Sequence, residues 1–343
     1  MQDYMRLILA FIVSAAVVMV IAPFFIPMLR RLKYGQVERE EGPHAHSAKE
    51  GTPSMGGLMF MIAILAATLI FSKYDIAFSF SVPALVMMVG FGLIGFLDDF
   101  IKAKKKRNLG LKAYQKIIAQ VVLAAIVAVY AYKSEYIGPT VRFATFDTAV
   151  NFGWFYIPLV MFTVIAIVNS TNLTDGLDGL ASGVTLIYSL AMGVLFLYLG
   201  KAFSSGFAGE PRFEAESGGM TAMAVFAFAV AGGMLGFLSK NSYPAKVFMG
   251  DTGSMALGGA ISAMVIYSGH MFLFLIMGCC IVASAVSVVL QVGSYKLRHG
   301  KRIFRMAPLH HHFELKGYPE TKIVTGYMIV TALACLAALL LFM

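Results

Sequence analysis

Long apolar runs recur along the whole of this sequence and constrain its fold more than any other feature. A helix needs about 20 apolar residues to cross the hydrocarbon core of a bilayer. Ten segments come close to that length, at residues 7–29, 54–72, 78–97, 115–132, 154–169, 180–199, 218–238, 250–267, 270–292 and 321–343. Only 13% of the 343 residues are charged, about half the share in a soluble domain. We therefore predict an all-α, polytopic membrane protein with about ten transmembrane helices, forming a single domain over residues 1–343.

The positive charges indicate how such a bundle is oriented. The chain has 27 Lys and Arg residues and a formal net charge of +9. Of the 27, 21 lie in or beside alternate loops, those after the first, third, fifth, seventh and ninth expected helices. Because Lys and Arg accumulate in cytoplasmic loops, we expect these loops in the cytoplasm and both termini outside. This distribution explains the positive charge, so a lipid bilayer is expected as partner and nucleic acid is not.

Carboxylates gather at the cytoplasmic ends of the expected helices. Five of the eight aspartates lie there: Asp98, Asp99, Asp175, Asp178 and Asp251. Acidic groups at membrane depth are costly and usually functional. The pair Asp98-Asp99 ends an apolar run, where negative charge opposes the helix dipole unless a metal or a nearby Lys compensates. The alternative for this pair is a helix end that simply reaches water beside lipid-binding cations.

A second polar segment contains Asn172, Asp175 and Asp178, spaced i, i+3, i+6. On a helix this spacing places all three on one face, although caps for the following helix would use the same residue types. A third segment runs from Asn241 to Ser254, where small residues surround Asp251. Such a helix start suits a metal–phosphate contact.

Two further segments complete the polar set. His310, His311 and His312 are consecutive, so on a helix they point about 100° apart and cannot all bind one metal. We interpret them as donors to phosphate or sugar rather than as zinc ligands. Lys49, Thr52 and Ser54 precede Gly56-Gly57 and could hold a phosphate, although their spacing is not that of a P-loop.

Acids, lysines and histidines on one face predict phosphoryl transfer. Mg²⁺ takes oxygen ligands, typically one or two carboxylates plus substrate phosphates and waters. Phosphoryl transfer needs mainly positioning and charge neutralisation. A location at the boundary between water and lipid favours one soluble and one lipid substrate. A transporter or channel is the rival class, but it would place acids near the midplane and tend to show internal repeats.

Four motifs together resemble the polyprenyl-phosphate N-acetylhexosamine-1-phosphate transferase superfamily. They are Asp98-Asp99, Asn172 to Gly179, Phe248 to Asp251 and Pro308 to Glu314. The last of these, with Lys49 to Gly57, is similar to the branch that uses UDP-MurNAc-pentapeptide, with Ser54 standing where Thr is expected. The similarity extends from about residue 30 to 325.

This resemblance implies a bacterial enzyme with ten helices in the cytoplasmic (inner) membrane and an active site that faces the cytoplasm. The expected reaction transfers phospho-MurNAc-pentapeptide from UDP-MurNAc-pentapeptide to undecaprenyl phosphate, giving lipid I and UMP. Mg²⁺ dependence and a homodimer are also implied. The alternative is a sister transferase that uses UDP-GlcNAc.

The resemblance also implies roles for individual residues. Asp251 would bind Mg²⁺, and Asp98 would orient or deprotonate the lipid phosphate, with Asp99 supporting it and the metal. The remaining expected substrate contacts fall into three sets: Lys49, Thr52, Ser54 and Lys102 for phosphate; Asn172, Asp175, Asp178, Asn241 and Phe248 for uridine; and His310, His311 and His312 for phosphate and sugar. Position alone favours Phe248 as part of the interfacial aromatic belt, whereas the resemblance favours stacking on uracil.

Overall fold

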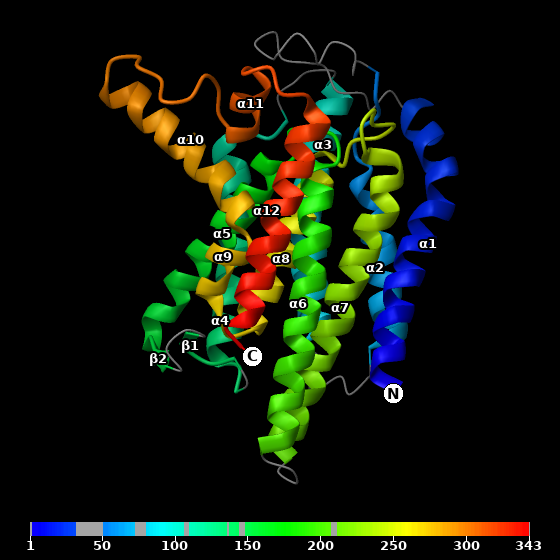
Figure 1. Ribbon diagram of the computed structural model, residues 1–343, viewed down its shortest axis with the longest axis vertical. Helices are drawn as coiled ribbons and strands as arrows, with labels where there is room; N and C mark the ends of the chain where they lie inside the picture. The colour runs from blue at the N-terminus through cyan, green and yellow to red at the C-terminus, as the bar shows by residue number, and fades with distance from the viewer. Residues whose placement is uncertain are drawn as a thin grey trace.

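The computed structural model describes residues 2–31, 51–72, 80–105, 110–135, 137–143, 148–206 and 211–342. Its helices are α1 (Gln2–Arg31), α2 (Gly57–Phe71), α3 (Ser81–Lys105), α4 (Ala113–Lys133), α5 (Tyr156–Thr174), α6 (Leu180–Gly206), α7 (Pro211–Asn241), α8 (Gly250–Tyr267), α9 (Phe274–Met277), α10 (Cys279–Leu297), α11 (Leu309–Glu314) and α12 (Glu320–Leu340) (Figure 1). Short 3-10 turns at Gly153–Phe155 and Met271–Leu273 precede α5 and α9.

Eight of the described helices are long and apolar enough to cross a membrane: α1, α3, α4, α5, α6, α7, α10 and α12. This confirms a helical, polytopic membrane protein. A two-stranded antiparallel hairpin, β1 (Thr140–Phe143) with β2 (Thr148–Asn151), was not expected from the apolar pattern. Its register pairs Thr140 with Asn151 and Phe143 with Thr148.

Two expected helices differ from the simple pattern. Helix α2 has only 15 residues. The ninth expected helix, over 270–292, is not continuous, because α9 ends at Met277 and α10 begins at Cys279, with Gly278 between them. The ring of Phe274 packs against Gly278, where a side chain would collide with it. The prediction of one uninterrupted helix over 270–292 is therefore wrong.

Helix α8 lies inside the bundle, packed against α2, α3 and α5. Almost every one of its residues is buried. A helix enclosed on all sides presents no face to lipid, which explains why α8 is rich in Gly, Ala and Ser. Small residues let the neighbouring helices come close. At Gly95 of α3, a Cβ would overlap the backbone carbonyl of Asp251.

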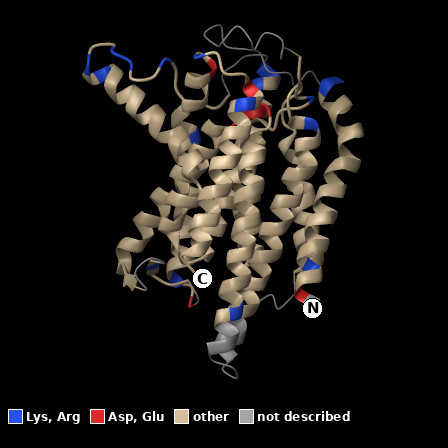
Figure 2. Cartoon of the chain, viewed as in Figure 1, with Lys and Arg blue, Asp and Glu red and all other residues tan. Residues whose placement is uncertain are grey.

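Charged residues mark one end of this bundle. Figure 2 shows a cluster of acidic and basic residues at the end away from both chain termini. The C-terminal end of α3 and the N-terminal end of α8 meet there. Packing of α3 on α8 thus brings together segments that are about 150 residues apart in the sequence.

Candidate active site

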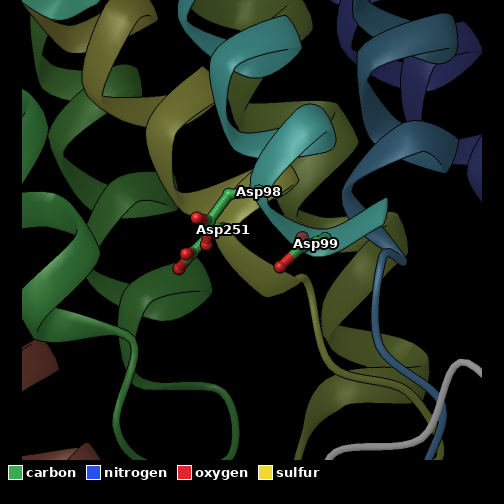
Figure 3. A group of neighbouring side chains, drawn as sticks. All are labelled: Asp98, Asp99 and Asp251. Atoms are coloured by element: carbon green, nitrogen blue, oxygen red, sulfur yellow. The ribbon is translucent and has the colours of Figure 1, made fainter. Parts of the chain in front are cut away.

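Three carboxylates from two helices form the centre of the site. Asp98 and Asp99 lie near the end of α3, and Asp251 lies in the first turn of α8. One oxygen from each carboxylate lies within 4.8 Å of the others. Figure 3 shows the three side chains together. Asp98 and Asp99 are 3% and 7% exposed. Buried like charges this close require cations to offset their repulsion.

Two lysines supply positive charge within this cluster. Lys102 Nζ lies 2.6 Å from Asp98 Oδ2, 2.8 Å from Asp251 Oδ2 and 3.6 Å from Asp99 Oδ1. Lys116 Nζ, from the first turns of α4, lies 2.9 Å from Asp251 Oδ2 and 3.9 Å from Asp98 Oδ2. Three carboxylates and two ammonium groups leave one formal negative charge. Lys116 was not identified from the sequence, where it is a single Lys at the start of an apolar run.

Hydrogen bonds from the surrounding chain hold each carboxylate in place. Asp99 Oδ2 accepts bonds from the backbone N–H and the hydroxyl of Thr252, both at 2.8 Å. The backbone N–H of Leu111 donates to Asp98 Oδ1 at 2.7 Å. Asn172 Nδ2 donates to Asp251 Oδ1 at 2.8 Å. The cluster is therefore rigidly supported from α3, α5, α8 and the segment before α4.

The turn into α8 requires glycine at position 250. Gly250 has a φ of +70°, a conformation that glycine adopts without strain. A Cβ there would also lie 2.5 Å from Asp99 Oδ2 and 2.7 Å from Ser54 Oγ. Ser54 thus lies beside the carboxylate cluster, and its contact with phosphate stays a prediction.

The segment that contains Thr52 and Ser54 packs against Phe248. The backbone N–H of Phe248 donates to Pro53 O at 2.9 Å, and that of Gly56 donates to Phe248 O at 2.9 Å. Phe248 and Thr52 are both partly buried. Lys49, the remaining residue expected from this loop, lies outside the described residues.

The predicted single helical face for Asn172, Asp175 and Asp178 is wrong. Helix α5 ends at Thr174, and Asp175 is its cap residue with a ψ of 57°. Gly176 and Gly179 follow, and glycine favours a turn over continued helix. Asn172 alone stays on the helix, where it bonds Asp251 and also donates to Ser254 Oγ at 2.7 Å.

Asp178 and Asn241 connect the α5–α6 turn to the chain before α8. Asp178 Oδ2 accepts a bond from Ala245 N at 2.9 Å, while its own N–H donates to Glu320 Oε1 at 2.5 Å. The buried Asn241 amide accepts from Ser182 Oγ at 2.8 Å and donates to Val247 O at 3.0 Å. These contacts stabilise the polar loops against each other. Their expected contact with uridine stays a prediction.

The three histidines have three different environments on the short helix α11. His310 is fully buried and packs against Gly176. His311 Nδ1 lies 2.5 Å from Glu314 Oε2. Desolvation and the charges of Lys316 and Arg305 lower the pKa of His312, so its ring is neutral near pH 7. His312 Nδ1 then accepts the backbone N–H of Arg305 at 3.1 Å.

The donor set at the centre is suited to a divalent metal ion. Asp98, Asp99 and Asp251 offer hard carboxylate oxygens from rigid helix ends, which Mg²⁺ and Ca²⁺ prefer over softer ligands. Lysines and the Asn172 amide lie around them and could stabilise a phosphate. The chemistry that these groups can support together is transfer of a phosphoryl group between bound oxygens.

Comparison with known proteins identifies the family. The family model for glycosyl transferase family 4 matches residues 80–269. A phospho-N-acetylmuramoyl-pentapeptide-transferase of Clostridioides difficile is 49% identical over 320 residues, which is 93% of this chain and 92% of that protein. Proteins of the same name are 44% identical in Thermoanaerobacter sp. strain X514 (96% of both chains) and in Halalkalibacterium halodurans (98% of this chain and 97% of that protein). The chain belongs to the phospho-N-acetylmuramoyl-pentapeptide-transferase family, within glycosyl transferase family 4.

Proposed function

We propose that this protein transfers phospho-MurNAc-pentapeptide from UDP-MurNAc-pentapeptide to undecaprenyl phosphate, with lipid I and UMP as products. The observation that carries this proposal is the cluster of Asp98, Asp99 and Asp251 with two lysines at one end of a membrane bundle. Every relative described above has a name that specifies a muramoyl-pentapeptide rather than an N-acetylglucosamine substrate. This supports the proposal over a UDP-GlcNAc transferase.

The proposal includes Mg²⁺, held by Asp251 and Asp99. Both residues present carboxylates at the cluster, and Asp99 is oriented by two bonds from Thr252. A bound Mg²⁺ would neutralise charge on the pyrophosphate of the nucleotide. Around it, Lys102 and Lys116 would bind phosphate oxygens, and Asn172 would keep Asp251 oriented.

The mechanism we favour is direct attack by the lipid phosphate. One of its oxygens forms a bond to the β-phosphorus of the nucleotide, and the bond from that phosphorus to the oxygen bridging to the α-phosphorus breaks. UMP leaves with the electron pair of that bond. A phosphate monoester has a second pKa near 6, so the attacking group is largely deprotonated at neutral pH. Asp98 then serves mainly to orient it. The rival mechanism uses Asp98 or Asp251 as a nucleophile and forms a phospho-enzyme.

The topology belongs to the same proposal. We infer ten spans, adding α2 and the enclosed α8 to the eight long apolar helices. The charged end would face the cytoplasm, with both termini outside the bacterial cytoplasmic membrane. The excess of Lys and Arg in alternate loops supports this orientation. A homodimer, implied by the family resemblance, completes the proposal.

Release of UMP is the direct test. Purified protein with UDP-MurNAc-pentapeptide and undecaprenyl phosphate should release UMP only when Mg²⁺ is present. UDP-GlcNAc in place of the first substrate should give little or none. Equal turnover of both nucleotides would reject the proposed specificity. Labelled sugar phosphate trapped on the protein without lipid phosphate would reject direct attack.

Replacing Phe248 by alanine should weaken binding of UDP-MurNAc-pentapeptide by about 1–3 kcal/mol, the usual value of stacking a base on an aromatic ring. That corresponds to about 5- to 150-fold in Kd. Phe100→Ala is the control, because Phe100 is an exposed ring near the same end that packs on Phe96. Equilibrium binding by calorimetry measures both variants. An unchanged Kd for Phe248→Ala would contradict stacking on uracil and favour a place for Phe248 in the interfacial aromatic belt.

A further inference from the structure

The end of α10 and the loop after it extend away from the rest of the bundle. Figure 1 shows α10 leaning outward, with its C-terminal end far from the other long helices. We call residues 295–305 the α10 arm. It is described throughout, and nearly all of its residues are exposed. The function proposed above does not use this segment.

The arm carries positive charge without any compensating acid of its own. Its five cations are Lys296, Arg298, Lys301, Arg302 and Arg305, and its sequence contains no Asp or Glu. Among the described residues, none of these five lies within ion-pair distance of a carboxylate. The ion pairs in the described part of the chain involve Arg6, Lys102, Lys116 and His311 instead. Figure 2 shows these basic residues at the tip of α10 and along its loop. Such a surface attracts a polyanion or an array of anions.

Apolar side chains lie directly beside this charge. Leu297 is 83% exposed, Tyr295 53% and Ile303 49%. Large exposed apolar groups next to cations are typical of segments that lie in the interface of a membrane, where the apolar groups enter the acyl region and the cations stay at the headgroups. An acidic protein partner would need the cations but not the exposed Leu297 and Ile303 beside them.

The arm is held in one shape by side chains of α10. The Gln291 amide donates to Phe304 O at 2.9 Å and accepts from the backbone N–H of Ile303 and Phe304 at 3.1 and 2.9 Å. Ser294 Oγ donates to Lys301 O at 2.8 Å. These bonds fold the loop back on the helix, so Lys301 and Arg302 are held close to Lys296 and Arg298. The cations therefore form a fixed patch.

We propose that the α10 arm binds the phosphate headgroups of anionic phospholipids in the leaflet at the catalytic end. Each Lys or Arg near an anionic surface adds attraction that decays within a Debye length. The arm combines several such cations with apolar side chains that enter the acyl region. Only the identity of the leaflet, cytoplasmic rather than outer, rests on the proposed function and topology.

The chain offers a clean fluorescence test, because Trp154 is its single tryptophan. The variant Trp154→Phe/Tyr295→Trp places one reporter on the arm. It is reconstituted in vesicles of equal phosphatidylglycerol and phosphatidylcholine, with brominated acyl chains on one lipid or on the other. Quenching by the brominated anionic lipid should exceed quenching by the zwitterionic one, with a local enrichment of about three- to fivefold. In 1 M salt this enrichment should fall to near one.

Two controls separate the arm from a general effect of charge. The native Trp154, 75% exposed beside α5 at the other end of the bundle, should report no preference between the two lipids. In the reporter background, Lys296→Gln/Lys301→Gln should at least halve the enrichment. Lys112→Gln/Lys322→Gln, which removes two exposed lysines elsewhere at the charged end, should leave it unchanged.

Equal quenching by both lipids at the arm, or an enrichment insensitive to Lys296→Gln/Lys301→Gln, would overturn the proposal. UMP release in detergent should be normal in both double variants, so failure of this proposal is distinguishable from failure of the proposed reaction.

Discussion

Asp251→Asn should lower UMP release by about 10³-fold and abolish its response to Mg²⁺. Removing a single preorganised electrostatic group from an active site costs about 10²–10³ in rate, and Asp251 has more than one role. Its carboxylate contacts Lys102, Lys116 and Asn172. With the charge removed, two ammonium groups face two carboxylates, so the net negative charge that attracts a divalent cation disappears.

The matched control for this substitution is Asp3→Asn. Asp3 lies at the other end of the bundle, where it is 3.8 Å from Arg6, and its loss should leave activity unchanged. Binding of Mn²⁺, followed by electron paramagnetic resonance, should weaken in Asp251→Asn and not in Asp3→Asn. Activity of Asp251→Asn that still requires Mg²⁺ and stays within tenfold of the parent would contradict the proposed metal role.

Hydropathy made the bundle predictable from the sequence, because the bilayer sets the length and composition of each spanning helix. The carboxylates were equally visible, since acids at the end of an apolar run have few structural reasons to be there. Lys116 was not visible. A Lys in the first turn of an apolar helix is ordinarily a side chain that reaches out to water. Only the packing of α4 beside α3 and α5 places its ammonium group on Asp251.

The two wrong predictions fail for the same physical reason, which is that glycine interrupts the helix within the segment expected to be helical. Asp175 and Asp178 fit a 3.6-residue period, but Gly176 and Gly179 turn the chain after Thr174. The ninth apolar run likewise contains Gly278, where one helix ends and the next begins. Apolar composition reflects the membrane that a segment crosses, whereas the breaks lie at glycines, with His310 packed against Gly176 and Phe274 packed against Gly278.

Gly95→Ala should reduce activity by about 10²-fold although residue 95 has no reactive group. A Cβ at this position would overlap the carbonyl of Asp251 and come 2.7 Å from the backbone N of Thr252. Backbone atoms cannot rotate away, so α3 and α8 must move apart. That movement separates Asp98 and Asp99 from Asp251. Displacing catalytic groups by about 1 Å can cost 10²-fold in rate, and overpacking of this kind typically costs about 1–3 kcal/mol of stability.

Gly90→Ala makes the same chemical change on the same helix and is the control. A Cβ there would come 2.8 Å from Cδ2 of Leu123, the end of a flexible side chain that can move aside. Its activity and melting temperature should stay close to those of the parent, whereas Gly95→Ala should lose both activity and affinity for Mn²⁺. If the two variants behaved alike in UMP release, close contact between α3 and α8 would not be what assembles the three carboxylates. The spacing of the α3 and α8 backbones is therefore expected to determine catalysis as much as the carboxylates that these helices carry.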